Sequence, residues 1–271
     1  MNPPASRNLL EEFNINAPHV TEVRRLLQTL TRQDSGQNRK VYMMASAGRG
    51  EGKSTICALL AIISAKIFHK RTLVIDGDMR RPTLHYLLGL PQRPGLYDAL
   101  HRVQPLDIVT RPTPLSTLYA ITSGRPTNVG EAYLDDEFAA LLQEVRPKYD
   151  VIFIDAAPVV PVVEPLLMAE HVDSVLVVAM AGRTPLMLVR RMRQLIEPIL
   201  PKVSGIVLNN AIEGLPYYYD YRYYGYEQPQ QKRIRTTARS TGPSGPSAGG
   251  QYIQDRGSLG REGSDGGGTS D

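Results

Sequence analysis

The sequence lacks the residues that disulfide-bonded and membrane-spanning proteins need. Its single cysteine, Cys57, cannot form an internal disulfide, and the apolar run around it, ICALLAIISA, predicts a buried thiol in a reducing cytosol. No uninterrupted apolar stretch approaches the roughly 20 residues that span a bilayer. The segment MNPPASRNLL at the start lacks the apolar core of a signal peptide. We therefore expect a cytoplasmic protein that is soluble by itself and reaches a membrane only through a partner.

A strong excess of positive charge is also missing. The chain has 31 Lys and Arg against 27 Asp and Glu, a formal net charge of +4. This balance permits contact with a nucleotide or an anionic surface. No compact run of Lys and Arg forms a reading face, so we expect no nucleic-acid partner.

Tryptophan is absent and phenylalanine is scarce, yet tyrosine is concentrated in one place. The segment PYYYDYRYYGYE, residues 216–227, holds seven of the fourteen tyrosines. They are Tyr217, Tyr218, Tyr219, Tyr221, Tyr223, Tyr224 and Tyr226. Pro216 bounds this run and Gly225 interrupts it, so it is a poor candidate for a core strand. An aromatic edge strand or an adhesive patch is the alternative to a chemical role.

Apolar residues become rare after Glu227. Residues 228–271 are mainly Gln, Ser, Thr, Gly and charged residues, a composition that cannot offset the entropy of ordering and predicts a disordered tail. We divide the chain into an N-terminal extension (1–16), one domain (17–215), the tyrosine cluster (216–227) and the tail (228–271).

Within the domain, short apolar runs alternate with longer helical patterns. The predicted strands are residues 41–45, 72–76, 106–109, 118–121, 150–155, 174–180 and 204–209. The predicted helices are residues 54–68, 131–146, 163–170 and 184–200. Several strands are almost wholly apolar, as expected when helices cover both faces of a sheet. The alternation predicts a doubly wound, mostly parallel α/β sheet in a single domain.

The first predicted strand leads into a glycine-rich loop that precedes a helix. Such a loop can close its backbone N–H groups around phosphate oxygens at the positive end of the helix. Lys53 can then reach the β and γ phosphates, and the Ser54 hydroxyl can bind Mg²⁺. Ala47 stands where the general pattern has its first glycine. The candidate nucleotide-binding residues are Ala47, Gly48, Arg49, Gly50, Glu51, Gly52, Lys53, Ser54 and Thr55.

Three carboxylates follow predicted strands. Asp76 and Asp78 come after residues 72–76, and Asp155 ends residues 150–155. Ligands of doubly wound sheets bind beyond the carboxyl ends of the strands, so these acids should share an edge with Lys53. An aspartate after a strand is also a common turn former, but three beside a nucleotide loop favour an Mg²⁺–nucleotide site.

The base of the nucleotide is indicated less directly. Guanine recognition usually requires an N-K-x-D segment after a late strand, and the sequence has none there. The last predicted strand ends in GIVLNN, whose Asn209 or Asn210 amide could reach an adenine edge, although asparagine is also a common turn residue. We therefore expect ATP with Mg²⁺.

Together these segments resemble the bacterial tyrosine kinases of capsule and exopolysaccharide synthesis, which are built on a P-loop NTPase fold of the deviant Walker A type. AGRGEGKS resembles the Walker A loop, and LVIDGDMRRP resembles the second acidic motif of that family. VIFIDAAP is similar to its Walker B motif, with Ala157 where the family usually has proline. ITSGRPTNVGEAY is loosely similar to a further Gly-x-x-Pro-x-Asn segment. The resemblance covers roughly residues 17–227 and includes the tyrosine-rich end.

The resemblance implies roles for these residues. Lys53 and the loop amides would stabilise the transferring phosphoryl group, and Ser54, Asp78 and Asp155 would hold Mg²⁺ directly or through water. Asp76 would orient the tyrosine hydroxyl and accept its proton. The tyrosine cluster would be the phosphoacceptor, presented to a neighbouring molecule of the same chain.

The resemblance also implies partners. A standalone member of this family works as a homo-oligomer with a separate transmembrane activator, the polysaccharide co-polymerase, at the inner face of the plasma membrane. It would regulate polysaccharide chain length or export. In the family, a helix with Glu-x-x-Arg-x-x-Arg joins subunits into a ring. Here Glu22 and Arg25 match but Gln28 replaces the second arginine, so an exposed helix face with an ion pair is the alternative.

Two other functions fit the same fold. Partition and septum-positioning ATPases carry an extra lysine five residues before the main one, and Gly48 occupies that position here. An inactive nucleotide-binding scaffold with an adhesive tyrosine segment is the other possibility. The missing lysine and the tyrosine cluster favour the kinase.

Overall fold

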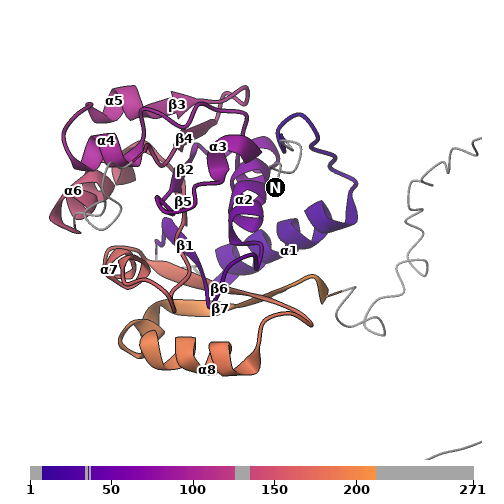
Figure 1. Cartoon of the computed structure of the whole chain (residues 1–271). Helices are drawn as coiled ribbons and strands as arrows, with labels where there is room; N and C mark the ends of the chain where they lie inside the picture. The colour runs from indigo at the N-terminus through magenta and orange to yellow at the C-terminus, as the bar shows by residue number, and fades with distance from the viewer. Residues whose placement is uncertain (1–7, 34–35, 37, 126–134, 212–271) are drawn as a thin grey trace, which may run out of the picture. The chain divides into compact units, whose positions relative to one another are not determined.

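Seven strands form one sheet at the centre of the fold, and helices lie on both of its faces (Figure 1). The computed structural model describes residues 8–33, 36, 38–125 and 135–211. The strands are β1 (Val41–Ser46), β2 (Thr72–Asp76), β3 (Thr110–Pro112), β4 (Leu118–Ile121), β5 (Val151–Asp155), β6 (Ser174–Met180) and β7 (Val203–Asn209). The tyrosine cluster and the predicted tail lie outside the described residues, and so do residues 126–133 of the segment ITSGRPTNVGEAY.

The helices vary widely in length. The longer ones are α1 (Pro18–Gln33), α2 (Lys53–Lys66), α6 (Asp135–Val145), α7 (Glu164–Glu170) and α8 (Leu186–Leu195). The shorter ones are α3 (Leu84–Leu87), α4 (Leu96–Leu100), α5 (Leu106–Val109) and the 3-10 helices η2 (Arg146–Lys148) and η3 (Glu197–Lys202). No helix among the described residues is long and apolar enough to cross a membrane.

The strand order is β3-β4-β2-β5-β1-β6-β7, and every neighbouring pair is parallel except β3 with β4. From β1 the chain moves toward one edge of the sheet to form β2, whereas from β5 it moves toward the other edge to form β6. The order therefore reverses between β1 and β5, which is where doubly wound sheets bind their ligands. The predicted doubly wound, mostly parallel sheet is confirmed.

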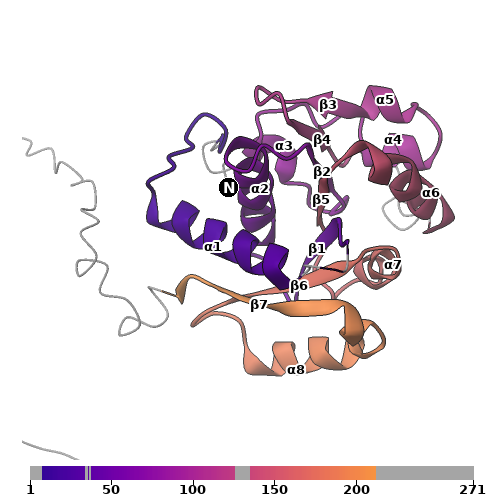
Figure 2. The same ribbon diagram turned by 180° about the vertical axis from the view of Figure 1, so that it is seen from behind.

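Alternate residues of the strands face two separate cores. Val41, Met43 and Ala45 of β1 join a core with α6, α7 and α8, whereas Tyr42 and Met44 join a core with α1, α2 and α3. Figures 1 and 2 show α1 and α2 against one face and α6 and α7 against the other. Because both faces are covered, β1, β2 and β5 are buried along their whole length.

Helix α2 is buried on almost all sides. Side chains from Ile56 to Ala65 are buried because the helix lies between the sheet and α1, whose Val20, Leu27 and Leu30 belong to the same core. Cys57 is fully buried within it, as predicted, and burial raises the pKa of its thiol. This packing fixes the start of α2, and with it Lys53, relative to the end of β1.

Two of the predicted elements are wrong. Residues 106–109 were expected as a strand but form α5, and the strand is β3, which pairs antiparallel with β4 at the sheet edge. A four-residue segment with three apolar residues cannot distinguish a strand from one helical turn. The extended Pro105 and Asp107 in the first turn suit a helix start. The helix predicted over 184–200 ends at Leu195 and continues as η3, which contains Pro198 and Pro201.

Candidate active site

Three loops meet at the carboxyl-terminal edge of the sheet. They follow β1, β5 and β2, which are neighbours in the sheet. Asp76 and Asp155 are register partners at the ends of β2 and β5. The Gly77 N–H donates to the Asp155 carbonyl (2.8 Å), and the Val159 N–H donates to the Ser46 carbonyl (2.9 Å). These backbone bonds hold the acidic loops beside the glycine-rich loop, as the sequence predicts.

The glycine-rich loop connects β1 directly to α2. Gly50 and Gly52 have φ angles of +74° and +91°, the left-handed region in which side chains are strained. Gly52 is also the N-cap of α2, so Lys53 occupies the first turn of the helix. Lys53 is buried, and its charge lowers the pKa of both Asp78 and Asp155. The ammonium group thus acts on the carboxylates of the two neighbouring loops.

Asp155 is the most isolated acid of the site. It is fully buried, and neither carboxylate oxygen has a hydrogen-bond partner among the described residues. Its pKa is raised from 3.8 to about 6. Burial is the main cause and the charge of Asp78 adds to it, whereas Lys53 and the Ser54 hydroxyl oppose the shift. Two unpartnered oxygens beside Ser54 suit a hydrated cation or the water bound to one.

Asp76 is held more firmly. Its Oδ2 accepts hydrogen bonds from the backbone N–H groups of Thr83 (3.2 Å) and Leu84 (3.1 Å), at the start of α3. Its Oδ1 is buried without a partner. Burial raises its pKa well above 3.8, followed by the charges of Asp155 and Asp78, whereas the two N–H groups lower it. Only Oδ1 is therefore available to a ligand.

Asp78 lies nearer the surface and closes a tight turn. Its Oδ1 accepts a hydrogen bond from the Arg81 N–H (3.0 Å). Burial raises its pKa, while the Arg81 N–H, Lys53 and the Arg80 N–H lower it, and the exposed Arg49 lowers it as well. Arg49 therefore exerts its charge on the acidic side of the site, a role that the sequence did not indicate.

The described residues contain no cluster of three His, Cys, Asp or Glu side chains close enough to hold a metal on their own. Magnesium rarely uses such a cage, because it keeps several waters and shares phosphate oxygens with its nucleotide. The partnerless oxygens of Asp155 and the neighbouring Ser54 hydroxyl therefore fit Mg²⁺ that arrives with a nucleotide.

The remaining loop residues are divided between core and surface. Ala47 is 1% exposed and packs in the hydrophobic core, which explains a small residue at this position. Ser54 is half-buried and Thr55 is exposed on α2. Glu51 is buried and bonded to Gly48 and to a residue after β6, so it faces away from the space that the loop encloses.

Asn209 does not project freely toward a base. Its Nδ2 donates to the Glu51 carbonyl (3.0 Å), and its Oδ1 accepts from the Asn210 N–H (2.9 Å). An adenine contact by Asn209 stays a prediction, and any such contact must use the second amide hydrogen or the remaining lone pair.

Arg80 connects the acidic loop to α7. Its guanidinium binds Glu164 Oε1 through Nε (2.9 Å) and Nη2 (2.6 Å). Sequence reasoning included Arg80 in the acidic motif but missed Glu164, which is 84 residues away and belongs to no recognised pattern.

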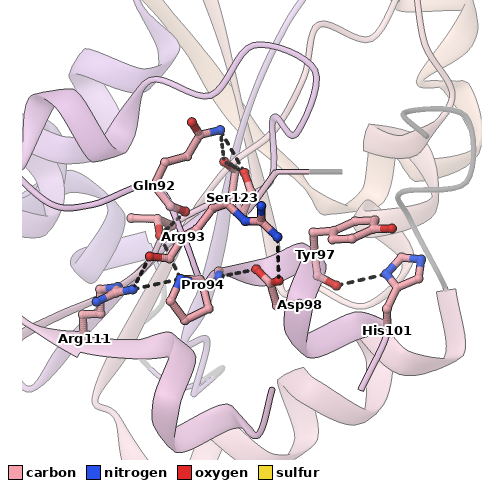
Figure 3. A network of polar contacts seen from close by, with 11 residues as sticks. Gln92, Arg93, Pro94, Tyr97, Asp98, His101, Arg111 and Ser123 are labelled. Carbon is pink, nitrogen blue, oxygen red and sulfur yellow. Dashed lines mark hydrogen bonds and ion pairs between the residues drawn. The ribbon is translucent and has the colours of Figure 1, made fainter. Parts of the chain in front are cut away.

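A polar network lies beyond the end of β4, the parallel neighbour of β2. Figure 3 shows it between the 92–98 loop and the residues after β4. Asp98 is buried and accepts from the Gly95 N–H (2.8 Å), while Arg93 lies 3.7 Å from its other oxygen. Gln92 Nε2 donates to the Gly124 carbonyl (2.9 Å), and Arg111 donates to the Arg93 carbonyl (2.6 Å). The network holds the exposed Arg93 in place. Nothing in the sequence pattern indicated this network.

The predicted ion pair on α1 is present. Arg25 Nη1 lies 2.7 Å from Glu22 Oε1, and both side chains are partly exposed. Gln28 is exposed on the same helix. Ring assembly through this helix stays a prediction.

Comparison with known proteins identifies the family of the chain. The chain is 32% identical over 189 residues to the putative tyrosine-protein kinase CapB of Staphylococcus aureus, and the match covers 69% of this chain and 81% of CapB. The chain belongs to the bacterial tyrosine-protein kinase family. It is also 31% identical to the tyrosine-protein kinase wzc of Salmonella typhi over 69% of its own length, but it spans about a quarter (26%) of that relative.

Solved structures agree with this family assignment. The chimerical protein CapA2B2 superposes with a TM-score of 0.67 at 29% identity, covering 77% of this chain and 91% of that structure. The septum site-determining protein MinD of Pyrococcus horikoshii superposes with a TM-score of 0.53 at 18% identity, which shows a shared P-loop NTPase fold. No family model matches the chain.

The buried Asp155 carboxylate should lower the stability of the nucleotide-free protein at neutral pH. Its folded-state pKa of about 6 exceeds the ordinary 3.8, so the native protein retains a proton that the unfolded chain releases. Stability from this group is therefore present at low pH and lost as pH rises from about 4 to about 6. We expect Asp155→Asn to raise the free energy of unfolding at pH 7.5 by up to about 3 kcal/mol, as measured by urea denaturation.

The gain should disappear at pH 4, where the native carboxyl is already neutral. Asp136→Asn on the exposed face of α6 is the matched control and should change stability little at either pH. A gain for Asp155→Asn that is equal at both pH values would contradict the electrostatic explanation.

Gly50 and Gly52, the glycines of the phosphate loop with positive φ, have different surroundings. Substitution by alanine should therefore have different effects at the two positions. A Cβ on Gly50 would meet nothing within 4 Å, whereas a Cβ on Gly52 would lie 2.1 Å from Asn209 Nδ2. We expect Gly50→Ala to cost about 1–2 kcal/mol from backbone strain alone. Gly52→Ala should cost at least about 1 kcal/mol more, since it also breaks the Asn209 hydrogen bond. Equal urea midpoints for the two variants would show that Asn209 moves aside freely.

Proposed function

We propose that this chain is an ATP- and Mg²⁺-dependent protein-tyrosine autokinase that phosphorylates residues 217–226 of a neighbouring copy. The observation that carries the proposal is the placement of Lys53 on one edge of the sheet with three buried carboxylates, in a chain whose relatives are named tyrosine-protein kinases. Bound Mg²⁺ would neutralise phosphate charge in this site. Ser54, Asp78 and Asp155 are the residues that would hold it.

The transfer itself requires little covalent chemistry from the protein. The phenolic oxygen of a tyrosine forms a bond to the γ-phosphorus, the bond from that phosphorus to the bridging oxygen breaks, and ADP leaves. Lys53 and the loop N–H groups stabilise charge on the phosphoryl oxygens. Asp76 uses Oδ1, its one unbonded oxygen, to orient the hydroxyl and accept its proton. Burial, followed by the neighbouring acids, raises the pKa of Asp76, which makes its ionised form a stronger proton acceptor.

The regulated process is polysaccharide chain length or export. One relative is named succinoglycan biosynthesis transport protein ExoP, from Rhizobium meliloti, and it is 34% identical over 65% of this chain. We propose that a transmembrane polysaccharide co-polymerase activates this chain and holds it, as a homo-oligomer, at the inner face of the plasma membrane. The described residues contain no membrane-spanning helix, so the proposal assigns the membrane contact to this partner.

The kinase proposal predicts where phosphate appears. After incubation with Mg-ATP and the cytoplasmic segment of the activator, peptide mass spectrometry should find phosphate on Tyr217–Tyr226 of the wild type and none on Lys53→Met. Steady ATP hydrolysis with an unmodified cluster would instead indicate a positioning ATPase. Binding without any turnover would indicate a scaffold.

Substitution of Asp76 and of Asp78, the two acids of the second motif, should affect different steps. Asp78→Asn is expected to weaken binding of Mg-ADP, because it removes a charge assigned to the cation. Asp76→Asn should bind Mg-ADP about as well as the wild type and lose roughly 10²–10⁴-fold in phosphorylation rate, because it cannot accept the proton. Titration of Mg-ADP and single-turnover kinetics measure the two effects, and the reverse pattern would exchange the roles.

Phosphorylation of the cluster should also control assembly. Each phosphotyrosine adds about −1.5 to −2 charges, so seven would add roughly −10 to −14, which exceeds the formal net charge of +4. Phosphates crowded into ten residues repel each other and any acidic docking site. We expect the phosphorylated form to sediment as a smaller species than the unphosphorylated form, and identical oligomeric states would rule this mechanism out.

A further inference from the structure

Glu51 lies within the phosphate loop, but its side chain points to the loop's neighbours. The side chain is 5% exposed. Its Oε2 accepts a hydrogen bond from the Gly48 N–H (3.1 Å), and its Oε1 accepts one from the Thr184 hydroxyl (2.7 Å). Both carboxylate oxygens are therefore engaged on the side of the loop that faces α8.

Thr184 is itself fixed by the backbone. It lies in the turn between β6 and α8, and its Oγ1 accepts a hydrogen bond from the Met180 N–H (2.8 Å). Because this N–H occupies a lone pair of the hydroxyl, the hydroxyl proton is directed to Glu51. The hydrogen bond joins two residues that are 133 positions apart in the sequence.

A second connection reaches the loop from β7. Asn209 ends this strand, and its Nδ2 donates to the backbone carbonyl of Glu51 (3.0 Å). The Asn209 carbonyl accepts from the Ala181 N–H (2.8 Å), in the same turn that carries Thr184. The two connections thus arise from one corner of the sheet, where Figure 1 places β6, β7 and α8 together.

The loop is packed closely against both connections. A Cβ on Gly52 would lie 2.1 Å from Asn209 Nδ2, and a Cβ on Gly48 would lie 2.8 Å from Leu188 Cδ2 of α8. These glycines allow the loop to approach β7 and α8 closely enough for the hydrogen bonds of Glu51 to form.

We propose that Glu51, Thr184 and Asn209 are positioning residues, which hold the N–H groups of the phosphate loop in their binding arrangement from the β6–α8 turn and from β7. Glu51 acts on the nucleotide through the loop and does not contact it. A loop that is already arranged loses less conformational entropy when the ligand binds, so the restraint increases affinity. The proposal rests on the proposed function only for the identity of the ligand.

Amide hydrogen exchange of the nucleotide-free protein tests the restraint directly. Thr184→Val removes the hydroxyl that binds Glu51, and it should increase exchange of the peptide spanning residues 47–53 about 5–10-fold. Thr184→Ser keeps the hydroxyl and should restore wild-type exchange. Thr29→Val is the matched control, since it removes an exposed hydroxyl that bonds only to the Arg25 carbonyl within α1.

A second pair of variants tests Glu51. Glu51→Gln can accept from the Gly48 N–H and donate to Thr184 Oγ1, so it should exchange like the wild type. Glu51→Val loses both bonds and should exchange faster. Adding Thr184→Val to Glu51→Val should have little further effect on exchange, because the two residues act through one hydrogen bond.

Affinity for Mg-ADP then shows whether the restraint serves the ligand. We expect Thr184→Val to bind about 5-fold more weakly and Thr184→Ser to bind like the wild type. Faster exchange with unchanged affinity, or unchanged exchange in Thr184→Val, would overturn the positioning role. If the wild type fails to bind Mg-ADP while Thr184→Val still exchanges faster, the nucleotide function fails and the restraint on the loop is supported separately.

Discussion

The crowding of buried carboxylates around one buried lysine is the constraint on which the site depends. Parallel strands β1, β5 and β2 end side by side, so Lys53, Asp155 and Asp76 are brought together at the same edge. Burial raises the pKa of both acids, and Lys53 offsets only part of this for Asp155. A medium that solvates charge poorly also strengthens every interaction with a triphosphate and its cation. Burial of the charged groups therefore both destabilises the free protein and strengthens its binding of a triphosphate with its cation.

The repulsion between these buried carboxylates explains why hydrogen bonds and an ion pair hold the surrounding loops in place. Unpaired buried carboxylates would push the loops apart unless backbone contacts held them. Asp76 is fixed by the start of α3, and the β2 loop is joined to α7 through Arg80 and Glu164. The phosphate loop is joined to the other side of the sheet through Glu51. Each brace uses hydrogen bonds or an ion pair outside the reacting space, so both oxygens of Asp155 and Oδ1 of Asp76 stay unpartnered among the described residues.

The sequence predicted those parts of the site that follow from local pattern and parallel topology. A strand, a glycine-rich loop and a helix define the position of Lys53, and the rule that ligands bind at the carboxyl ends of strands brings Asp76, Asp78 and Asp155 to it. It could not predict contacts such as Thr184 with Glu51 or Gln92 with Gly124, because their partners share no motif or period. Residues 106–109 were misassigned for a different reason, since a four-residue segment is too short to show a period.

Position 48 illustrates how one fold can serve different functions. The motif expected of positioning ATPases has a lysine at this position, whereas this chain has Gly48. In this structure a side chain at residue 48 would begin 2.8 Å from Leu188 Cδ2, and the Gly48 N–H is already bonded to Glu51. A lysine would therefore have to displace Leu188 of α8 and enter the side of the loop that Glu51 and Thr184 occupy. The packing of α8 against the loop thus disfavours a lysine at this position, and the same space holds a restraint within one chain.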